Sequence, residues 1–237
     1  MAGLTYATYK TALATLSVVP ETDPNWLLIL PDAIDYAELR IYRDLDLLST
    51  VTTDTSFSTT ANASKVQLTQ GTFVTLQNVN VITPAGTSNP DFGTRNPVLP
   101  VSKEYIQYSW PSSTNAGVPE YFAMIDERTF SLGPWPDDAY TLEIIGTYRP
   151  ATLSVSNTTT FISQYLPDLF LMASMIFVSG YQRNFGRQSD DPAMAQSYES
   201  QYQALLRGAT VEEYRKKFAA SGWTSISPSP VATVGRG

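Results

Sequence analysis

The ten-residue run LFLMASMIFV, at positions 169–178, contains no charged side chain. It is about half as long as the roughly 20 apolar residues that a membrane-spanning helix needs. The run lies in a longer segment, 164–185, that is apolar nearly all round, and a helix of that kind must be covered by partners on every side. It therefore predicts a buried helix in a helical bundle, and not a membrane anchor.

Further helices are predicted on both sides of this run. The expected helices cover residues 4–19, 24–48, 164–185 and 192–219. Asp23 and Pro24 fit the N-cap and the first position of the second helix, and Asp191 and Pro192 repeat this pattern at the last one. Pro31 should kink or split the second helix, because proline removes a backbone donor.

Between the second and third helices the residue composition changes and the helical periodicity ends. From about residue 51 to about residue 150, short segments rich in Thr and β-branched residues, such as YTLEIIGTY, alternate with turn residues and predict strands. EYIQYSW, at 104–110, is interpreted as one of them. Residues 83–100 contain too many prolines and glycines for regular structure and are expected to form a loop.

The predicted fold class is therefore α+β. The N- and C-terminal helices form a bundle, and an antiparallel β sandwich or barrel is inserted between them. The expected divisions are 1–49 for the N-terminal helices, 50–155 for the β module, 156–220 for the C-terminal helices and 221–237 for an extended arm.

The composition excludes several kinds of chemistry. The chain has no histidine and no cysteine, which rules out Ser-His-Asp and Cys-His catalysis, zinc sites built on these residues, iron–sulfur clusters and disulfides. No cofactor is expected. The formal net charge of −7 argues against general nucleic-acid binding, because phosphate contacts need clustered Lys and Arg. A protein past which DNA slides can still be acidic.

Two alternative functions come from the β region. One is a cell-wall or glycan hydrolase, which needs two carboxylates, although adjacent acids are more often turn residues. The candidate acids are Asp126, Glu127, Asp137 and Asp138. The other is a glycan-binding module in which Trp110 and Trp135 stack on sugar, although a β core or a subunit interface explains these aromatics as well.

The C-terminal sequence WTSISPSPVATVGRG predicts a binding segment. Trp223, Ile226, Val231 and Val234 are apolar and are separated by serines and prolines in an extended pattern. A frayed terminus is usually polar, whereas extended apolar segments often add to the sheet edge or groove of a partner. These four residues are therefore the predicted partner-binding site.

Two stretches resemble a known family, the head-to-tail adaptor or connector proteins of short-tailed and related bacteriophages. IDYAELRIYRDLDLL, at 34–48, resembles the first helical signature of that family. YRPATLS, at 148–154, and the segment from TFISQYL at 160 to YRKK at 217 resemble its C-terminal helical pair. Smaller adaptors are nearly all helical, so residues from about 50 to 155 have no counterpart in them.

The resemblance implies a non-enzymatic virion protein. It would be one subunit of a ring, commonly of twelve copies, that joins the portal to the tail and surrounds a channel through which genomic DNA passes without sequence-specific binding. Its partners would be the portal protein, which the C-terminal arm would hold, tail or nozzle proteins, and further copies of itself. The chain would be assembled in the host cytoplasm and reside in the virion neck. The residues expected at the subunit interface are Phe170, Phe177, Tyr181, Tyr198 and Tyr202.

Overall fold

A computed structural model describes residues 3–184 and 194–220. The chain divides into two compact units, one formed by the residues up to 48 together with those from 151 onward, and the other by residues 49–150. We call them the helical unit and the β unit. This division places residues 151–155 with the helices, where Leu153 is buried in the core. The α+β class predicted from the sequence is confirmed.

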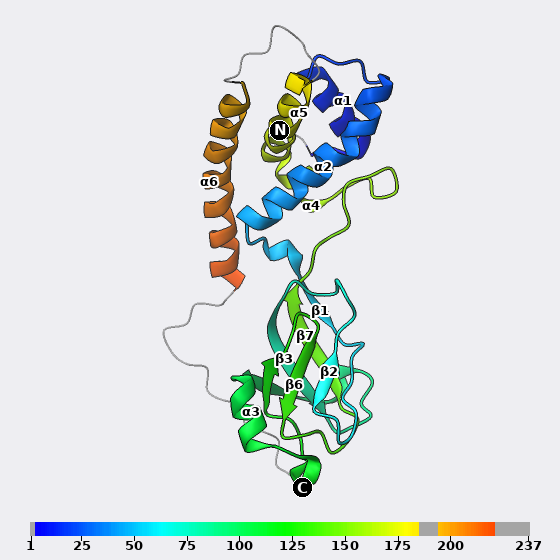
Figure 1. Ribbon diagram of the computed structural model, residues 1–237, viewed down its shortest axis with the longest axis vertical. Helices are drawn as coiled ribbons and strands as arrows, with labels where there is room; N and C mark the ends of the chain where they lie inside the picture. The colour runs from blue at the N-terminus through cyan, green and yellow to red at the C-terminus, as the bar shows by residue number, and fades with distance from the viewer. Residues whose placement is uncertain (1–2, 185–193, 221–237) are drawn as a thin grey trace. The chain divides into compact units, whose positions relative to one another are not determined.

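The helical unit is built around one apolar helix (Figure 1). Its helices are α1 (Tyr6–Leu16), α2 (Pro24–Asp44), α4 (Phe161–Tyr165), α5 (Pro167–Asn184) and α6 (Met194–Ala220). α5 packs against all four others and buries Leu169, Phe170, Ala173 and Val178. The prediction of a buried helix at 169–178 is thus confirmed. Within the described part of the chain, no helix is long and apolar enough to cross a membrane.

Helix α2 begins as its sequence predicts. The Asp23 carboxylate accepts hydrogen bonds from the backbone N–H groups of Asn25 and Trp26, at 2.8 and 3.0 Å, which satisfies donors that have no partner within the helix. The helix is not split at Pro31, because burial of the neighbouring residues Leu30, Ala33 and Ile34 in the core offsets the loss of one backbone hydrogen bond. It ends at residue 44, before the predicted end at 48.

The segment predicted as one helix over 164–185 belongs to two. Leu166, between α4 and α5, has φ −128° and ψ 42°, outside the helical region. The next residue is Pro167, whose ring disfavours helical backbone in the residue before it. The break is therefore caused by Pro167, which the prediction from the apolar run did not take into account.

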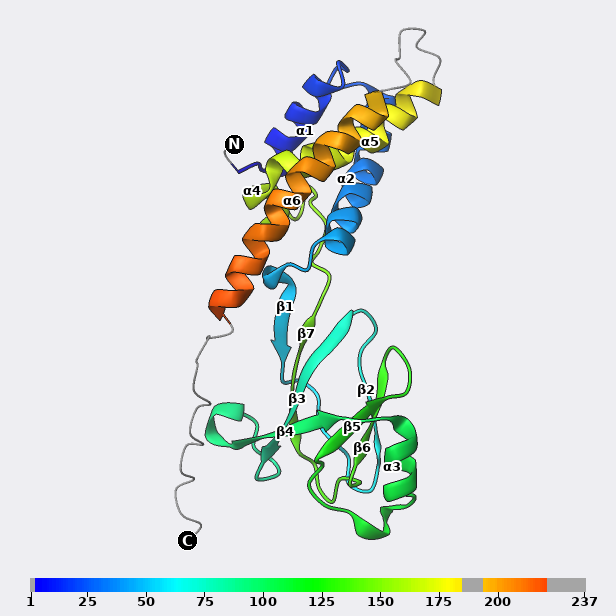
Figure 2. The ribbon, with the colours of Figure 1, turned by 90° about the vertical axis from the view of Figure 1, so that its left-hand side faces the viewer.

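The β unit contains one curled sheet of seven strands (Figure 2). Its strands are β1 (Val51–Asp54), β2 (Lys65–Gln67), β3 (Thr75–Thr83), β4 (Thr94–Pro100), β5 (Tyr121–Met124), β6 (Thr129–Gly133) and β7 (Thr141–Thr147). A 3-10 turn, η1 (Leu48–Thr50), leads into β1, and two more, η2 (Pro90–Phe92) and η3 (Ser113–Asn115), lie between strands. The strand order is β1-β7-β3-β4-β5-β6-β2. The sheet is mixed, because β4 and β5 are parallel where the sequence predicted only antiparallel pairs.

Strand β4 gives the sheet its curl. It pairs with β3 along residues 94–98 and with β5 at Leu99 and Pro100, so it belongs to both halves of the sheet. The buried core of the unit consists of Val66, Leu68, Phe73, Val79, Val81, Val98, Phe122, Phe130, Leu132, Tyr140, Leu142 and Ile144.

Two further predictions in this unit were wrong. EYIQYSW forms a short helix, α3 (Lys103–Ser109), in which the Ser102 hydroxyl caps the N–H of Tyr105 at 3.2 Å and only Ile106 is buried. The supposed loop over 83–100 contains β4. Pro97 is tolerated there because the strand pairs only with β3 at that position. The other edge of the strand has no partner there, so it needs no backbone N–H donor.

Candidate interaction site

No metal site is evident in the described ranges, where no group of three or more acidic side chains is placed to hold an ion. The features that stand out are a polar network behind an exposed turn, an aromatic pocket, and the attachment of α6.

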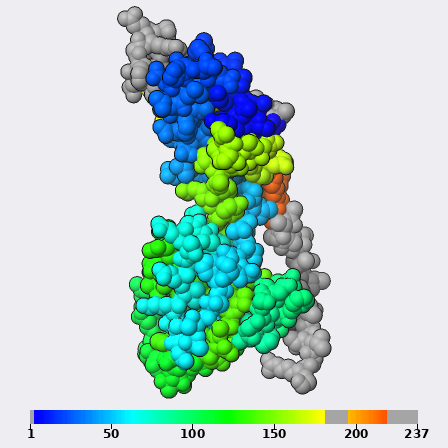
Figure 3. Space-filling model, turned by 90° about the vertical axis from the view of Figure 1, so that its right-hand side faces the viewer, coloured from blue at the N-terminus to red at the C-terminus, as the bar shows by residue number. Residues whose placement is uncertain are grey.

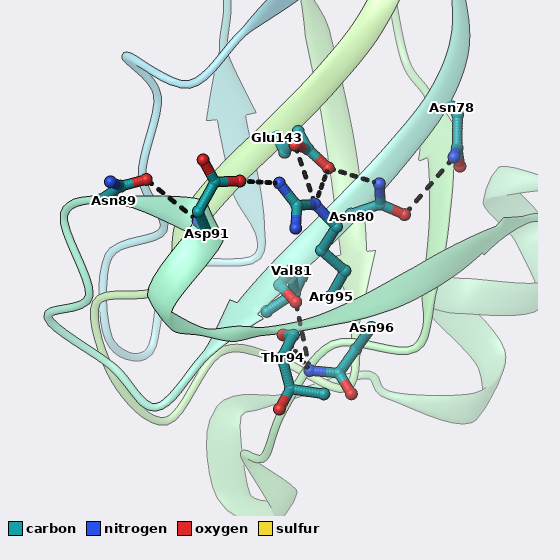
Figure 4. A network of polar contacts seen from close by, with 9 residues as sticks. All are labelled: Asn78, Asn80, Val81, Asn89, Asp91, Thr94, Arg95, Asn96 and Glu143. Atoms are coloured by element: carbon teal, nitrogen blue, oxygen red, sulfur yellow. Dashed lines mark hydrogen bonds and ion pairs between the residues drawn. The ribbon is translucent and has the colours of Figure 1, made fainter. Parts of the chain in front are cut away.

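The polar network centres on Glu143, a buried carboxylate on β7 (Figure 4). The Arg95 Nε on β4 lies 3.0 Å from both of its carboxylate oxygens, and the Asn80 amide on β3 donates to Oε2 at 2.9 Å. Arg95 also donates through Nη2 to Asp91 on η2, at 2.9 Å. The hydrogen bonds to Asp91 and Glu143 raise the pKa of Arg95. One guanidinium on β4 therefore ties η2 to β7, and Asn80 on β3, the strand between β4 and β7, binds the same carboxylate.

The turn before β4 is fixed in two further ways. The Asn89 side chain accepts the backbone N–H of Asp91 at 3.0 Å and caps η2. A Cβ added at Gly93 would lie 2.4 Å from Cγ2 of the buried Ile82, so only glycine allows the turn to lie this close to β3. Phe92, in the middle of this anchored segment, is 84% exposed. We call residues 89–93 the Phe92 turn.

The pocket lies between α3 and the β5–β6 hairpin and has a cavity volume of about 190 Å³. It is lined by Ser64, Lys65, Lys103, Ile106, Gln107, Trp110, Pro111, Ile125, Ser131 and Trp135, and we call it the Trp pocket. The Trp135 Nε1 donates to the Trp110 carbonyl at 3.0 Å, and the Trp110 ring stacks on Tyr121 with centroids 5.6 Å apart. Both indoles are therefore held in place.

The four candidate catalytic acids lie in turns. Asp126 accepts two backbone N–H groups, those of Arg128 and Thr129, both at 2.8 Å, between β5 and β6. These bonds lower the pKa of Asp126, whereas the acid of a glycosidase needs a raised one. Asp137 accepts the Tyr140 hydroxyl and Asp138 accepts the N–H of Ala139, each at 2.7 Å.

Helix α6 is attached to α2 and to the start of η1 by polar contacts at several points. Arg40 on α2 pairs with Glu199 at 2.6 Å, and its guanidinium lies 4.3 Å from the ring centroid of Tyr202. The Tyr202 hydroxyl donates to Asp44 at 2.7 Å. Nearer its end, the buried Glu213 accepts the backbone N–H of Leu48 at 3.1 Å.

The structure places four of the five predicted interface residues in or against the core of the helical unit. Phe170 and Tyr202 have no exposed surface and belong to the core of the helical unit, so their aromatic spacing marked internal packing. Phe177 and Tyr198 are half-buried against the same core. The Tyr181 side chain lies outside the described residues, as do the four residues predicted to bind a partner, Trp223, Ile226, Val231 and Val234.

Sequence reasoning missed two sets of exposed apolar residues. Val211 and Tyr214 are exposed on α6 at a spacing of three residues, a signal that periodicity could have found. Phe92 gave no usable signal, because it lies in a segment rich in proline and glycine.

A family model described as SU10 adaptor protein matches residues 4–225 of the chain. No curated protein matches the chain.

Proposed function

Because this chain belongs to the SU10 adaptor protein family, we propose that it is a subunit of the ring that joins the portal to the tail of a bacteriophage. The observation that carries the proposal is the extent of the family match, which takes in the whole β unit and most of the helical sequence. The protein would be assembled in the host cytoplasm and would reside in the neck of the virion.

The mechanism we propose is contact and not catalysis. Exposed apolar residues of α6, such as Val211 and Tyr214, are available for protein contacts. The chain carries 22 acidic and 15 basic residues, which suits a channel wall that repels DNA phosphate and lets the genome pass. We propose twelve copies around that channel, with portal on one side and tail or nozzle proteins on the other.

The ring is tested by native mass spectrometry of the full chain, alone and mixed with its portal protein. We expect a closed oligomer on the portal. A chain that stays monomeric in both samples would contradict the proposal.

The C-terminal arm is proposed to hold the portal through Trp223, Ile226, Val231 and Val234. Truncation after residue 221 should weaken portal binding by about ten-fold or more, as expected when several apolar anchors are lost. A full-length variant with all four residues changed to Ser is the matched control for arm length and should bind as weakly as the truncated chain. Equal portal affinity of all three proteins would refute a role for the arm.

The absence of catalysis is tested separately with a peptidoglycan zymogram. We expect no clearing by the wild-type protein. Clearing that disappears when Asp126, Glu127, Asp137 and Asp138 are changed to Ala would instead establish a hydrolase.

A further inference from the structure

The Phe92 turn presents an apolar side chain from a rigid base. Arg95, Asn89 and Gly93 fix its backbone, yet the Phe92 ring is 84% exposed. Because the backbone that carries the ring is already fixed, little backbone freedom is lost on binding, so more of the burial of the ring appears as affinity. Figure 3 shows this part of the chain, in teal, at the edge of the β unit.

The Trp pocket lies at the other end of the same strand. η2 ends at Phe92, β4 follows over Thr94–Pro100, and α3, which lines the pocket, begins at Lys103. A seven-residue strand spans about 23 Å at roughly 3.3 Å per residue, and Figure 2 shows the turn and α3 on opposite sides of the β unit. Phe92 therefore cannot reach the pocket of its own chain.

The turn and the pocket match in size and apolar character. The cavity of about 190 Å³ has Ile106, Pro111 and Ile125 beside its two indoles. An apolar cavity of about 150 Å³ is known to admit benzene, so the Trp pocket has room for the phenyl ring of Phe92.

They also match in charge. Asp91, directly before Phe92, pairs with Arg95 at 2.9 Å, and its side chain is still 75% exposed. The pocket carries two exposed cations, Lys65 and Lys103. Docking of the ring would bring Asp91 close to Lys65 and Lys103. Such charge complementarity favours the pairing of the turn with the pocket, and its orientation, over other contacts.

We infer that the Phe92 turn of one copy inserts into the Trp pocket of the next copy. The inference rests on the proposed function, in which copies of the chain form a ring, and it names the surfaces that meet. Since the two surfaces differ and lie on opposite sides of one unit, the contact is head-to-tail and repeats from copy to copy, as a closed ring requires.

The test uses full-length variants that each remove one side of the contact. Phe92→Ala deletes the ring, and Ile125→Glu places a carboxylate in the pocket at a residue that is itself 41% exposed. Each variant alone should self-associate about ten-fold or more weakly than wild type. The matched control, Tyr108→Ala, removes a more exposed aromatic that does not line the pocket, and should associate as wild type does.

Mixing the two variants gives the decisive measurement. A Phe92→Ala chain still has its pocket and an Ile125→Glu chain still has its turn, so we expect a one-to-one heterodimer that does not grow, seen by native mass spectrometry. If both variants form rings as well as wild type does, the inference is wrong while the proposed function stands. If wild type itself never forms an oligomer, with portal or without, the proposed function fails and the inference fails with it.

Discussion

Among single residues, Glu38 on α2 binds the segment that follows the β unit in the chain. Its carboxylate is 2% exposed and accepts hydrogen bonds from the backbone N–H of Leu153 at 3.3 Å and the Thr160 hydroxyl at 3.4 Å. Burial raises the pKa of Glu38 to about 7, an effect that these two bonds partly oppose and the charge of Asp35 adds to. At a pH between about 4.5 and about 7, the folded protein therefore holds a proton that the unfolded chain has lost.

This gives a prediction for stability against pH. Between about 4.5, the ordinary pKa of the group, and about 7, the folded state binds more protons than the unfolded state, so stability falls as pH rises. Glu38→Gln keeps an oxygen acceptor and carries no charge. It should flatten the slope over this range and be more stable than wild type at pH 8, by about 2–3 kcal/mol at most. Urea denaturation at several pH values measures it, and an unchanged slope would contradict the assignment.

At the scale of elements, α6 packs against α5, and Tyr202 is its one fully buried aromatic residue. Tyr202 is fully buried, with its hydroxyl on Asp44 and its ring under Arg40. Tyr202→Ala should lower the free energy of unfolding by about 3–5 kcal/mol, because it opens a cavity and leaves Asp44 without this donor.

Tyr214→Ala, the same change at an exposed position of α6, is the control and should change stability by less than about 0.5 kcal/mol. Chemical denaturation compares the two variants, and hydrogen exchange of α6 amides shows whether the loss is local. Equal effects of the two substitutions would show that Tyr202 does not anchor the helix.

At the scale of the whole molecule, the two units have separate hydrophobic cores with no residue in common. Phe130→Ala, in the core of the β unit, should lower the melting temperature of that unit and leave that of the helical unit unchanged, since each unit buries its own apolar surface. Differential scanning calorimetry resolves this, with Tyr108→Ala as the exposed control. One transition that shifts as a whole would show instead that the units unfold together.

The sequence by itself determined the α+β class, the buried helix at 169–178 and the start of α2 at the Asp23 cap, because each depends on periodicity or on contacts within a few residues. The resemblance of its helical segments also led to the adaptor family. EYIQYSW was predicted as a strand from its alternation, although the N-cap at Ser102 is a competing local signal that favours a helix.

Only the tertiary structure decided which exposed residues are available for contact. Phe170 and Tyr202 have the spacing of an interface but are covered by the rest of their own unit, whereas Phe92 is presented by a network that joins β3, β4 and β7. Asn80 and Glu143 of that network are 63 positions apart in the chain. Their contact exists only because the strands pair, and pairing between distant segments is set by the packing of the whole sheet and not by any local pattern.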